Sequence, residues 1–168
     1  MKIVVPYVSV ADETRSALDR AGRDWDAAFV GDDDEAYWRL LSSLWRSGQD
    51  FALVEHDVVI AEATLDLFEK CPNEWCANGY RYMAMDSYLG LGCTRFRGEL
   101  TRALPELMDR VAMLNYGNHG PRHWCPLDAQ IQFTLRSAGR VVCEHPAVKH
   151  LGLWPAHGCT AKPVTAPS

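Results

Sequence analysis

The first sixty residues alternate apolar segments with segments of helical periodicity, and this alternation constrains the fold more than any other feature. Three apolar segments have the length of buried strands: residues 2–5, 25–30 and 51–54. Two segments between them carry apolar side chains at helical spacing and end before a glycine: residues 12–21 and 35–46. Strand, helix, strand, helix and strand in this order predict an α/β fold with parallel neighbouring strands.

The rest of the chain continues the alternation of helices and strands. Further helices are expected at residues 61–69, at 97–114 with an interruption at Pro105, and from Asp128 to Gly139. Further strands are expected at residues 75–83 and 141–142. The sequence contains no internal repeat or dividing linker, so we expect one compact domain over residues 1–153 and a disordered tail over residues 154–168.

Composition excludes some classes of protein. With 48% apolar and 23% charged residues the chain can bury a core, and its net charge of −5 argues against a general nucleic-acid binder. No apolar run approaches the roughly 18–20 residues needed to span a membrane, and the start does not resemble an export signal. We therefore expect a cytoplasmic protein with reduced cysteines. The spacing of Cys71 and Cys76 is poor for zinc, so the cysteines are interpreted as structural.

The sharpest local feature is the acidic sequence Glu55-His56-Asp57, directly after the apolar segment 51–54. Side chains two residues apart lie on the same face of a strand, so Glu55 and Asp57 would converge. Ligands of α/β sheets bind beyond the carboxyl ends of the strands, and carboxylates there suit Mg²⁺ or Mn²⁺ carrying phosphates. Both acids could equally begin a solvated loop, and these residues alone do not decide between the two.

Other candidate residues also have structural interpretations. Asp128 opens a helix, where Asp is a preferred cap, although a cap can also be a catalytic base. Asp32 begins an acidic run after the second strand, which either contacts a base or ribose or starts a helix. His150 follows a short strand, and a single histidine is usually structural. Three arginines could meet phosphate, as any exposed arginine could: Arg39, Arg95 and Arg97.

In this order, the segments resemble the family 2 type of glycosyltransferase, whose nucleotide-sugar-binding fold is called GT-A. GQDFALVEHDVVI is similar to that family's strand ending in a DxD-like motif, with Glu55 in place of the first Asp. GLGCTRFRGELTRAL resembles its Gly-rich acceptor-side turn and the helix after it. LDAQIQFTLRSAGRVVCEHPAVKHLG resembles its segment with an acid pair that opens a helix and a late His150. Leu127 replaces the first acid of that pair, and Asp128 retains the second.

The resemblance implies a GT-A type of mixed, mainly parallel sheet flanked by helices in a single domain. It implies transfer of a sugar from a nucleotide-sugar donor to an acceptor hydroxyl, with inversion and with Asp128 as general base. It also implies a divalent metal, Mn²⁺ or Mg²⁺, on Glu55, Asp57 and His150. Donor contacts are implied at six positions: Pro6, Tyr7, Asp32, Arg39, Glu55 and Arg97. The acceptor could be a protein, a polysaccharide or a small molecule.

Three further interpretations are kept open. The first half is short for the family, as if one strand-and-helix unit were missing between Val30 and Glu35. The substituted acids Glu55 and Leu127 allow a degenerate module that binds a nucleotide sugar without transfer. A metal-dependent phosphoesterase, in which bound metal activates water, is the other alternative.

Overall fold

The computed structural model of the chain describes residues 1–82, 85–114 and 119–152. Its main sheet has six strands in the order β2-β1-β3-β8-β5-β9. These strands are β1 (Lys2–Tyr7), β2 (Asp26–Phe29), β3 (Phe51–Val54), β5 (Trp75–Asn78), β8 (Cys93–Phe96) and β9 (Cys143–His145). β8 runs antiparallel to both of its neighbours, and the other neighbouring strands pair in parallel. The expected α/β fold with a mixed, mainly parallel sheet is therefore confirmed.

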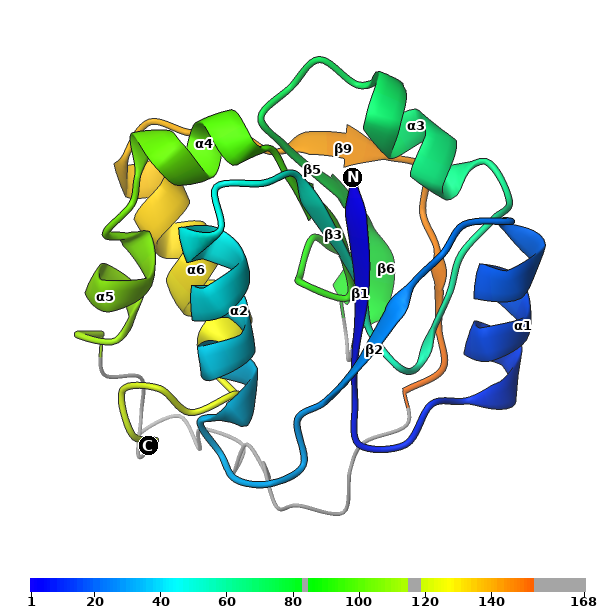
Figure 1. Cartoon of the computed structure of the whole chain (residues 1–168), viewed down its shortest axis with the longest axis horizontal. Helices are drawn as coiled ribbons and strands as arrows, with labels where there is room; N and C mark the ends of the chain where they lie inside the picture. The colour runs from blue at the N-terminus through cyan, green and yellow to red at the C-terminus, as the bar shows by residue number, and fades with distance from the viewer. Residues whose placement is uncertain (83–84, 115–118, 153–168) are drawn as a thin grey trace, which may run out of the picture.

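Helices cover both faces of the sheet (Figure 1). The helices are α1 (Asp12–Arg20), α2 (Ala36–Arg46), α3 (Thr64–Lys70), α4 (Gly98–Ala103), α5 (Leu107–Val111) and α6 (Leu127–Ser137). One hydrophobic cluster joins the sheet to α2, α4, α5 and α6, and a second joins the opposite face to α1 and α3. Alternate strand residues supply the two clusters, as Phe51 and Leu53 do on one face and Ala52 and Val54 on the other.

Two small sheets lie beside the main one. β4 (Val58–Val59) pairs antiparallel with β10 (Lys149–His150), and β6 (Tyr80–Tyr82) pairs antiparallel with β7 (Met85–Tyr88). No strand was expected at β4, β7 or β10. The β4–β10 pair matters most, because it fastens the segment after β9 to the turn that follows β3.

Other elements differ in detail from the expectations. Pro6 lies inside β1 rather than after it. The expected interruption of the helix over residues 97–114 at Pro105 is confirmed, because α4 and α5 lie on either side of that residue. β8 was not expected at all, because its sequence CTRF carries a buried arginine and lacks the apolar run of an interior strand. The last strand of the main sheet is at residues 143–145 rather than 141–142.

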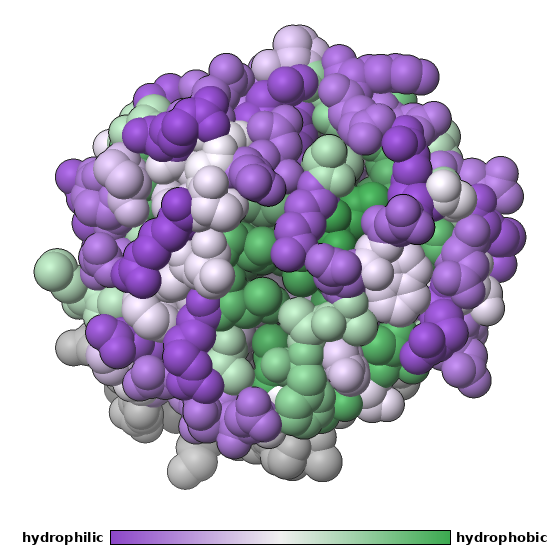
Figure 2. Space-filling model, in the orientation of Figure 1, coloured by the Kyte–Doolittle hydropathy of each residue, from purple (hydrophilic) through white to green (hydrophobic). Residues whose placement is uncertain are grey.

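The first part of the chain, before β3, supplies one edge of the main sheet. β2 is an edge strand and is followed directly by α2, which confirms that no further strand and helix intervene after Val30. Phe29 of β2 is 51% exposed. Figure 2 shows hydrophobic surface in the middle of the view, where Figure 1 shows β1 and β2 between α2 and α1. The chain before β3 therefore forms two strands and two helices, β1, α1, β2 and α2.

Some further expectations can be compared with the structure. Within the described ranges, no helix has both the length and the apolarity needed to cross a bilayer. Cys71, Cys76, Cys93 and Cys143 are free thiols, whereas Cys125 is disulfide-bonded, so the expectation of reduced cysteines is wrong for Cys125. The proposed tail, residues 154–168, lies outside the described residues.

Candidate active site

Glu55, Asp57 and His150 converge at the carboxyl end of β3. One ligand atom from each side chain lies within 4.8 Å of those of the other two. The acids do not converge by strand alternation, because β3 ends at Val54 and a turn follows in which the Val58 amide donates to the Glu55 carbonyl at 3.0 Å. His150 arrives on β10, where it pairs with Val58. The turn and the β4–β10 pair thus assemble the group.

His150 is held in a defined orientation. Its Nε2 lies 3.5 Å from Asp57 Oδ2, and the two side chains are only 12% and 6% exposed. Its ring stacks on Tyr80 with the ring centroids 4.8 Å apart and the planes 9° from parallel. The Leu151 amide donates to the Asp57 carbonyl at 2.8 Å, which fastens the same segment from the backbone. The imidazole is therefore presented to the carboxylates rather than to solvent.

Glu55 is also in contact with a tyrosine of α2. The Tyr37 hydroxyl donates to Glu55 Oε1 at 2.8 Å. Burial raises the pKa of Glu55, the nearby charges of Asp128 and Asp57 raise it further, and the Tyr37 hydrogen bond opposes this, so that the pKa is about 8. Burial also raises the pKa of Tyr37 well above its ordinary value, so its hydroxyl stays a donor.

Asp128 faces the same site from the first turn of α6. The helix begins at Leu127 with Pro126 in the cap position, and no side chain caps it, so the interpretation of Asp128 as a cap is wrong. Burial raises the pKa of Asp128 to about 6, against hydrogen bonds from the Leu91 amide and the Tyr88 hydroxyl. The charge of Asp128 in turn raises the pKa of Glu55, so the two carboxyl groups lie close enough to interact.

Gly90 permits this close arrangement. A methyl group added at Gly90 would lie less than 3.0 Å from both Tyr80 Oη and Asp128 Oδ2, closer than real Cβ atoms come. The backbone before β8 therefore forms one wall of the site, and only glycine leaves room for both side chains. The Gly92 carbonyl continues that wall by accepting the Glu55 amide at 2.8 Å.

The residues present fit a divalent metal. Three carboxyl groups, of Glu55, Asp57 and Asp128, gather here, and full ionisation of all three is costly without a counter-charge, which agrees with the raised pKa values of Glu55 and Asp128. Carboxylate oxygens with one imidazole nitrogen suit Mn²⁺ or Mg²⁺. Glu55, Asp57 and His150 could therefore hold the ion, with Asp128 beside it.

Four of the residues implied for donor binding lie along the same edge of the sheet. Pro6 and Tyr7 end β1, which is parallel to β3, so they lie on the side of Glu55. Asp32 is exposed in the connection from β2 to α2. Arg39 of α2 is engaged by Asp33, to which its two terminal nitrogens donate at 3.0 and 2.8 Å. A donor phosphate would compete with that pairing.

Arg97, by contrast, is not brought to this edge. β8 is antiparallel to β3, and Phe96 pairs with Phe51 at the start of β3, so Arg97 lies at the opposite end of the sheet. Its guanidinium donates to the Cys71 carbonyl and lies 4.0 Å from Asp50. The donor contact implied at Arg97 is therefore wrong. The direction of β8, which places Arg97, was not visible in the sequence.

Three tyrosines of the site were missed in the sequence. Tyr37 was counted as part of the apolar face of its helix, and Tyr80 and Tyr88 flank a hairpin that was not expected. A tyrosine among buried residues needs a partner for its hydroxyl, and this was the available signal. The rings of Tyr80 and Tyr88 also contact each other edge to face, with their centroids 5.8 Å apart.

Comparison with known proteins supports the fold independently of the site. No family model and no curated protein matches the sequence. The structure is similar to that of a glycosyltransferase involved in the glycosylation of the major capsid of PBCV-1, with TM-score 0.51, 11% identity, and 90% of this chain and 94% of that chain covered.

Two further solved structures are similar over most of their length. For CMP:2-keto-3-deoxy-manno-octonic acid synthetase complexed with CTP, the TM-score is 0.50 at 10% identity, with 88% of this chain and 90% of that chain covered. For A197 from STIV the TM-score is 0.50 at 10% identity, with 88% and 83% covered. At such low identity the likeness shows the fold alone. The chain has the GT-A-like, Rossmann-like α/β fold that glycosyl and nucleotidyl transferases share.

Proposed function

We propose that the chain is a metal-dependent glycosyltransferase that moves a sugar from a nucleotide-sugar donor to an acceptor hydroxyl, with inversion. The observation that carries this proposal is the position of Asp128. It is free of a capping role and lies beside Glu55 and the metal candidates at the carboxyl edge of the sheet. That edge is where α/β sheets bind their ligands.

Each group has a role in the proposed reaction. Glu55, Asp57 and His150 hold the ion, which when bound offsets the charge of the donor diphosphate. Pro6 and Tyr7, at the end of β1, contact the nucleoside. The exposed connection from β2 to α2 lies beside them. The backbone before β8 forms the wall beside Asp128, where Gly90 leaves room for its carboxylate.

Asp128 moves the proton. Its carboxylate takes the proton of the acceptor hydroxyl while that oxygen attacks the anomeric carbon, and the bond from this carbon to the diphosphate oxygen breaks with its electron pair leaving on the diphosphate. Attack from the face opposite the leaving group inverts the anomeric centre. A pKa of about 6 leaves Asp128 mostly ionised at neutral pH and still basic enough to accept a proton.

The test is to incubate the purified protein with a panel of nucleotide sugars, Mn²⁺ and candidate acceptors, and to measure nucleoside diphosphate release. Asp128→Asn should lower kcat by about 10²–10⁴-fold while donor binding persists. Asp57→Asn should weaken metal binding. Asp12→Asn is the matched control, because Asp12 is also an acid in the first turn of a helix but is exposed.

Each alternative gives a different product. Donor binding without turnover would indicate the degenerate module. Release of nucleoside monophosphate and sugar phosphate would indicate a phosphoesterase. Pyrophosphate release from a nucleoside triphosphate and a free sugar acid would indicate nucleotidyl transfer, the reaction class of a synthetase. The anomeric configuration of the product, read by NMR, tests inversion. An Asp128→Asn variant as active as the parent would contradict the proposed base.

A further inference from the structure

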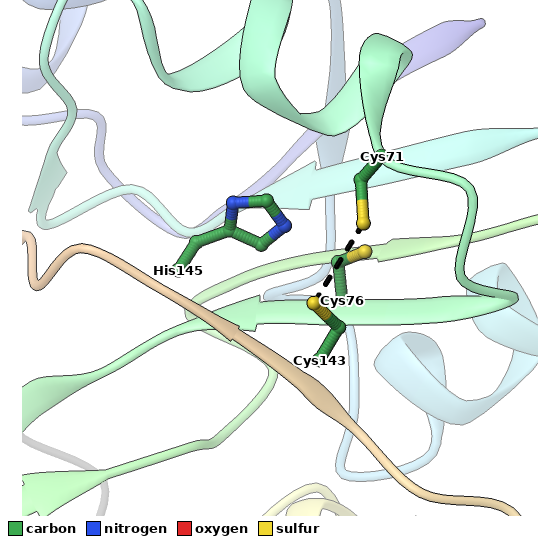
Figure 3. Close-up of side chains that lie close together, drawn as sticks. All are labelled: Cys71, Cys76, Cys143 and His145. Atoms are coloured by element: carbon green, nitrogen blue, oxygen red, sulfur yellow. Dashed lines mark hydrogen bonds between the residues drawn. The ribbon is translucent and has the colours of Figure 1, made fainter.

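A second cluster of metal-ligating side chains lies away from the candidate active site. It consists of Cys71, Cys76, Cys143 and His145, whose ligand atoms all lie within 4.8 Å of one another. Figure 3 shows the three sulfur atoms and the imidazole ring turned toward one common region between strands β5 and β9 and the segment after α3. This Cys/His cluster lies on the sheet face covered by α3.

Topology assembles the cluster from three segments. Cys76 of β5 pairs in register with Cys143 of β9, so both side chains lie on the same face of the sheet. His145 is two residues after Cys143 on the same strand and therefore shares that face. Cys71 is the residue that follows α3, directly above them. The spacing of Cys71 and Cys76 alone is poor for zinc, but the second pair comes from a strand 67 or more residues away.

The one sulfur–sulfur distance given by the structure matches a tetrahedral ion. The Sγ atoms of Cys71 and Cys143 are 3.7 Å apart. Two thiolates on one tetrahedral zinc, each at about 2.3 Å, would have their sulfurs about 3.8 Å apart. A disulfide needs about 2.05 Å, and all three cysteines are free thiols. Cys71 is 8% exposed and Cys76 is fully buried, whereas Cys143 and His145 are partly buried, so the cluster lies mostly below the surface.

Two polar groups around the cluster lack partners. His145 Nε2 is buried and makes no hydrogen bond to any described residue, while Phe68 packs edge-on against its ring with the centroids 5.4 Å apart. Arg95 is 1% exposed and donates to Cys76 Sγ at 2.9 Å, yet its Nε and Nη1 are buried without a partner among the described residues. A buried imidazole nitrogen and a buried cation both need a counterpart.

A zinc ion would supply both counterparts. Coordination would occupy the free nitrogen of His145, and three thiolates with one imidazole leave one net negative charge on the zinc site, which Arg95 offsets. Arg95 donates a hydrogen bond to Cys76 Sγ, and Asn73 Nδ2 donates one to Cys71 Sγ at 3.3 Å. Outer hydrogen bonds of this kind orient thiolate ligands.

We propose that Cys71, Cys76, Cys143 and His145 form a structural zinc site. Four protein ligands leave no open position, so the site is structural rather than catalytic. Zinc there joins the edge strand β9 to β5 and to the segment after α3. Because β10 follows β9 after a short connection, the site also anchors the segment that carries His150. The proposal does not depend on the proposed transferase activity.

The test measures metal in the full chain purified without chelators. We expect about one zinc per chain by elemental mass spectrometry. When Co²⁺ replaces the zinc, we expect thiolate-to-metal charge-transfer absorption and the intense visible bands of tetrahedral Co²⁺. His145→Cys keeps a four-ligand site and should retain zinc. His145→Phe keeps an aromatic ring against Phe68 but should lose most of the bound zinc. Cys93→Ser is the matched control, a buried cysteine outside the cluster that should leave zinc unchanged.

A surface variant tests the outer hydrogen bond without disturbing the core. Asn73 is exposed, and Asn73→Ala should lower zinc affinity by about 10–100-fold. Asp57→Asn should leave the zinc content intact, which separates this site from the active-site metal. The proposal is overturned if the reduced protein takes up no zinc, if bound Co²⁺ lacks thiolate charge transfer, or if His145→Phe retains full zinc. A Cys71–Cys143 disulfide recovered from freshly purified protein would overturn it in favour of a redox pair.

Discussion

Replacing Gly90 by alanine tests whether Asp128 acts from the position in which the structure holds it. The added methyl would lie less than 3.0 Å from Asp128 Oδ2, Tyr80 Oη and Tyr88 Cε1, whereas ordinary contacts begin at 3.4 Å. The carboxylate must therefore retreat by about 1 Å, a displacement that can lower a rate by about 10²-fold. All three contacts are with ends of side chains, so the fold should persist at a cost of about 1–3 kcal/mol in unfolding free energy.

The assay compares kcat for nucleoside diphosphate release with urea unfolding of the same preparation. Gly92→Ala is a matched variant, because the three atoms nearest to its methyl would all belong to the ring and hydroxyl of Tyr80 and none to Asp128. Gly120→Ala has nothing within 4 Å of its methyl and should behave as the parent. If Gly90→Ala acts by moving the base, it should have little further effect in an Asp128→Asn background.

A folded Gly90→Ala variant with the parent kcat would refute this reasoning. So would an equal loss from Gly90→Ala in the presence and absence of the Asp128 carboxylate, because the effect would then arise elsewhere in the site. A raised KM at constant kcat would place the glycine at the donor rather than at the base.

Three further outcomes follow from the site. Tyr37→Phe should lower the unfolding free energy by about 1–3 kcal/mol in urea titrations, because buried Glu55 loses a donor at 2.8 Å; an unchanged value would show that the bond contributes nothing net. Arg39→Ala should raise the donor KM with an unchanged unfolding midpoint, because its pair with Asp33 is exposed; an unchanged KM would remove Arg39 from donor binding. Exhaustive chelation should abolish transfer and Mn²⁺ should restore it, and activity that survives chelation would contradict the metal requirement.

The candidate site was only partly visible in the sequence. Glu55, Asp57 and Asp128 stand out as acids at the ends of predicted elements, and the resemblance added His150. The sequence suggested that Glu55 and Asp57 meet by strand alternation, but they meet in a turn. The contributions of Tyr37 and Tyr80 depend on contacts between segments far apart in the chain, and no local pattern reports those.

The positions of Arg97 and of the Cys/His cluster also could not be predicted from the sequence. Arg97 follows a strand whose direction is set by pairing with β3 and β5, and that direction carries it away from the donor edge. The cysteines seemed unsuited to zinc because spacing was read along the chain. The register between Cys76 and Cys143 makes them neighbours across strands.

The sequence by itself determined the α/β class, the positions of most helices and inner strands, and the short first half, because periodicity and glycine stops are local properties of the chain. Tertiary structure alone decided the antiparallel direction of β8, the pairing of β10 with β4, and the two clusters of ligating side chains. These depend on strand order and register, which follow from burial of the whole sheet between two layers of helices.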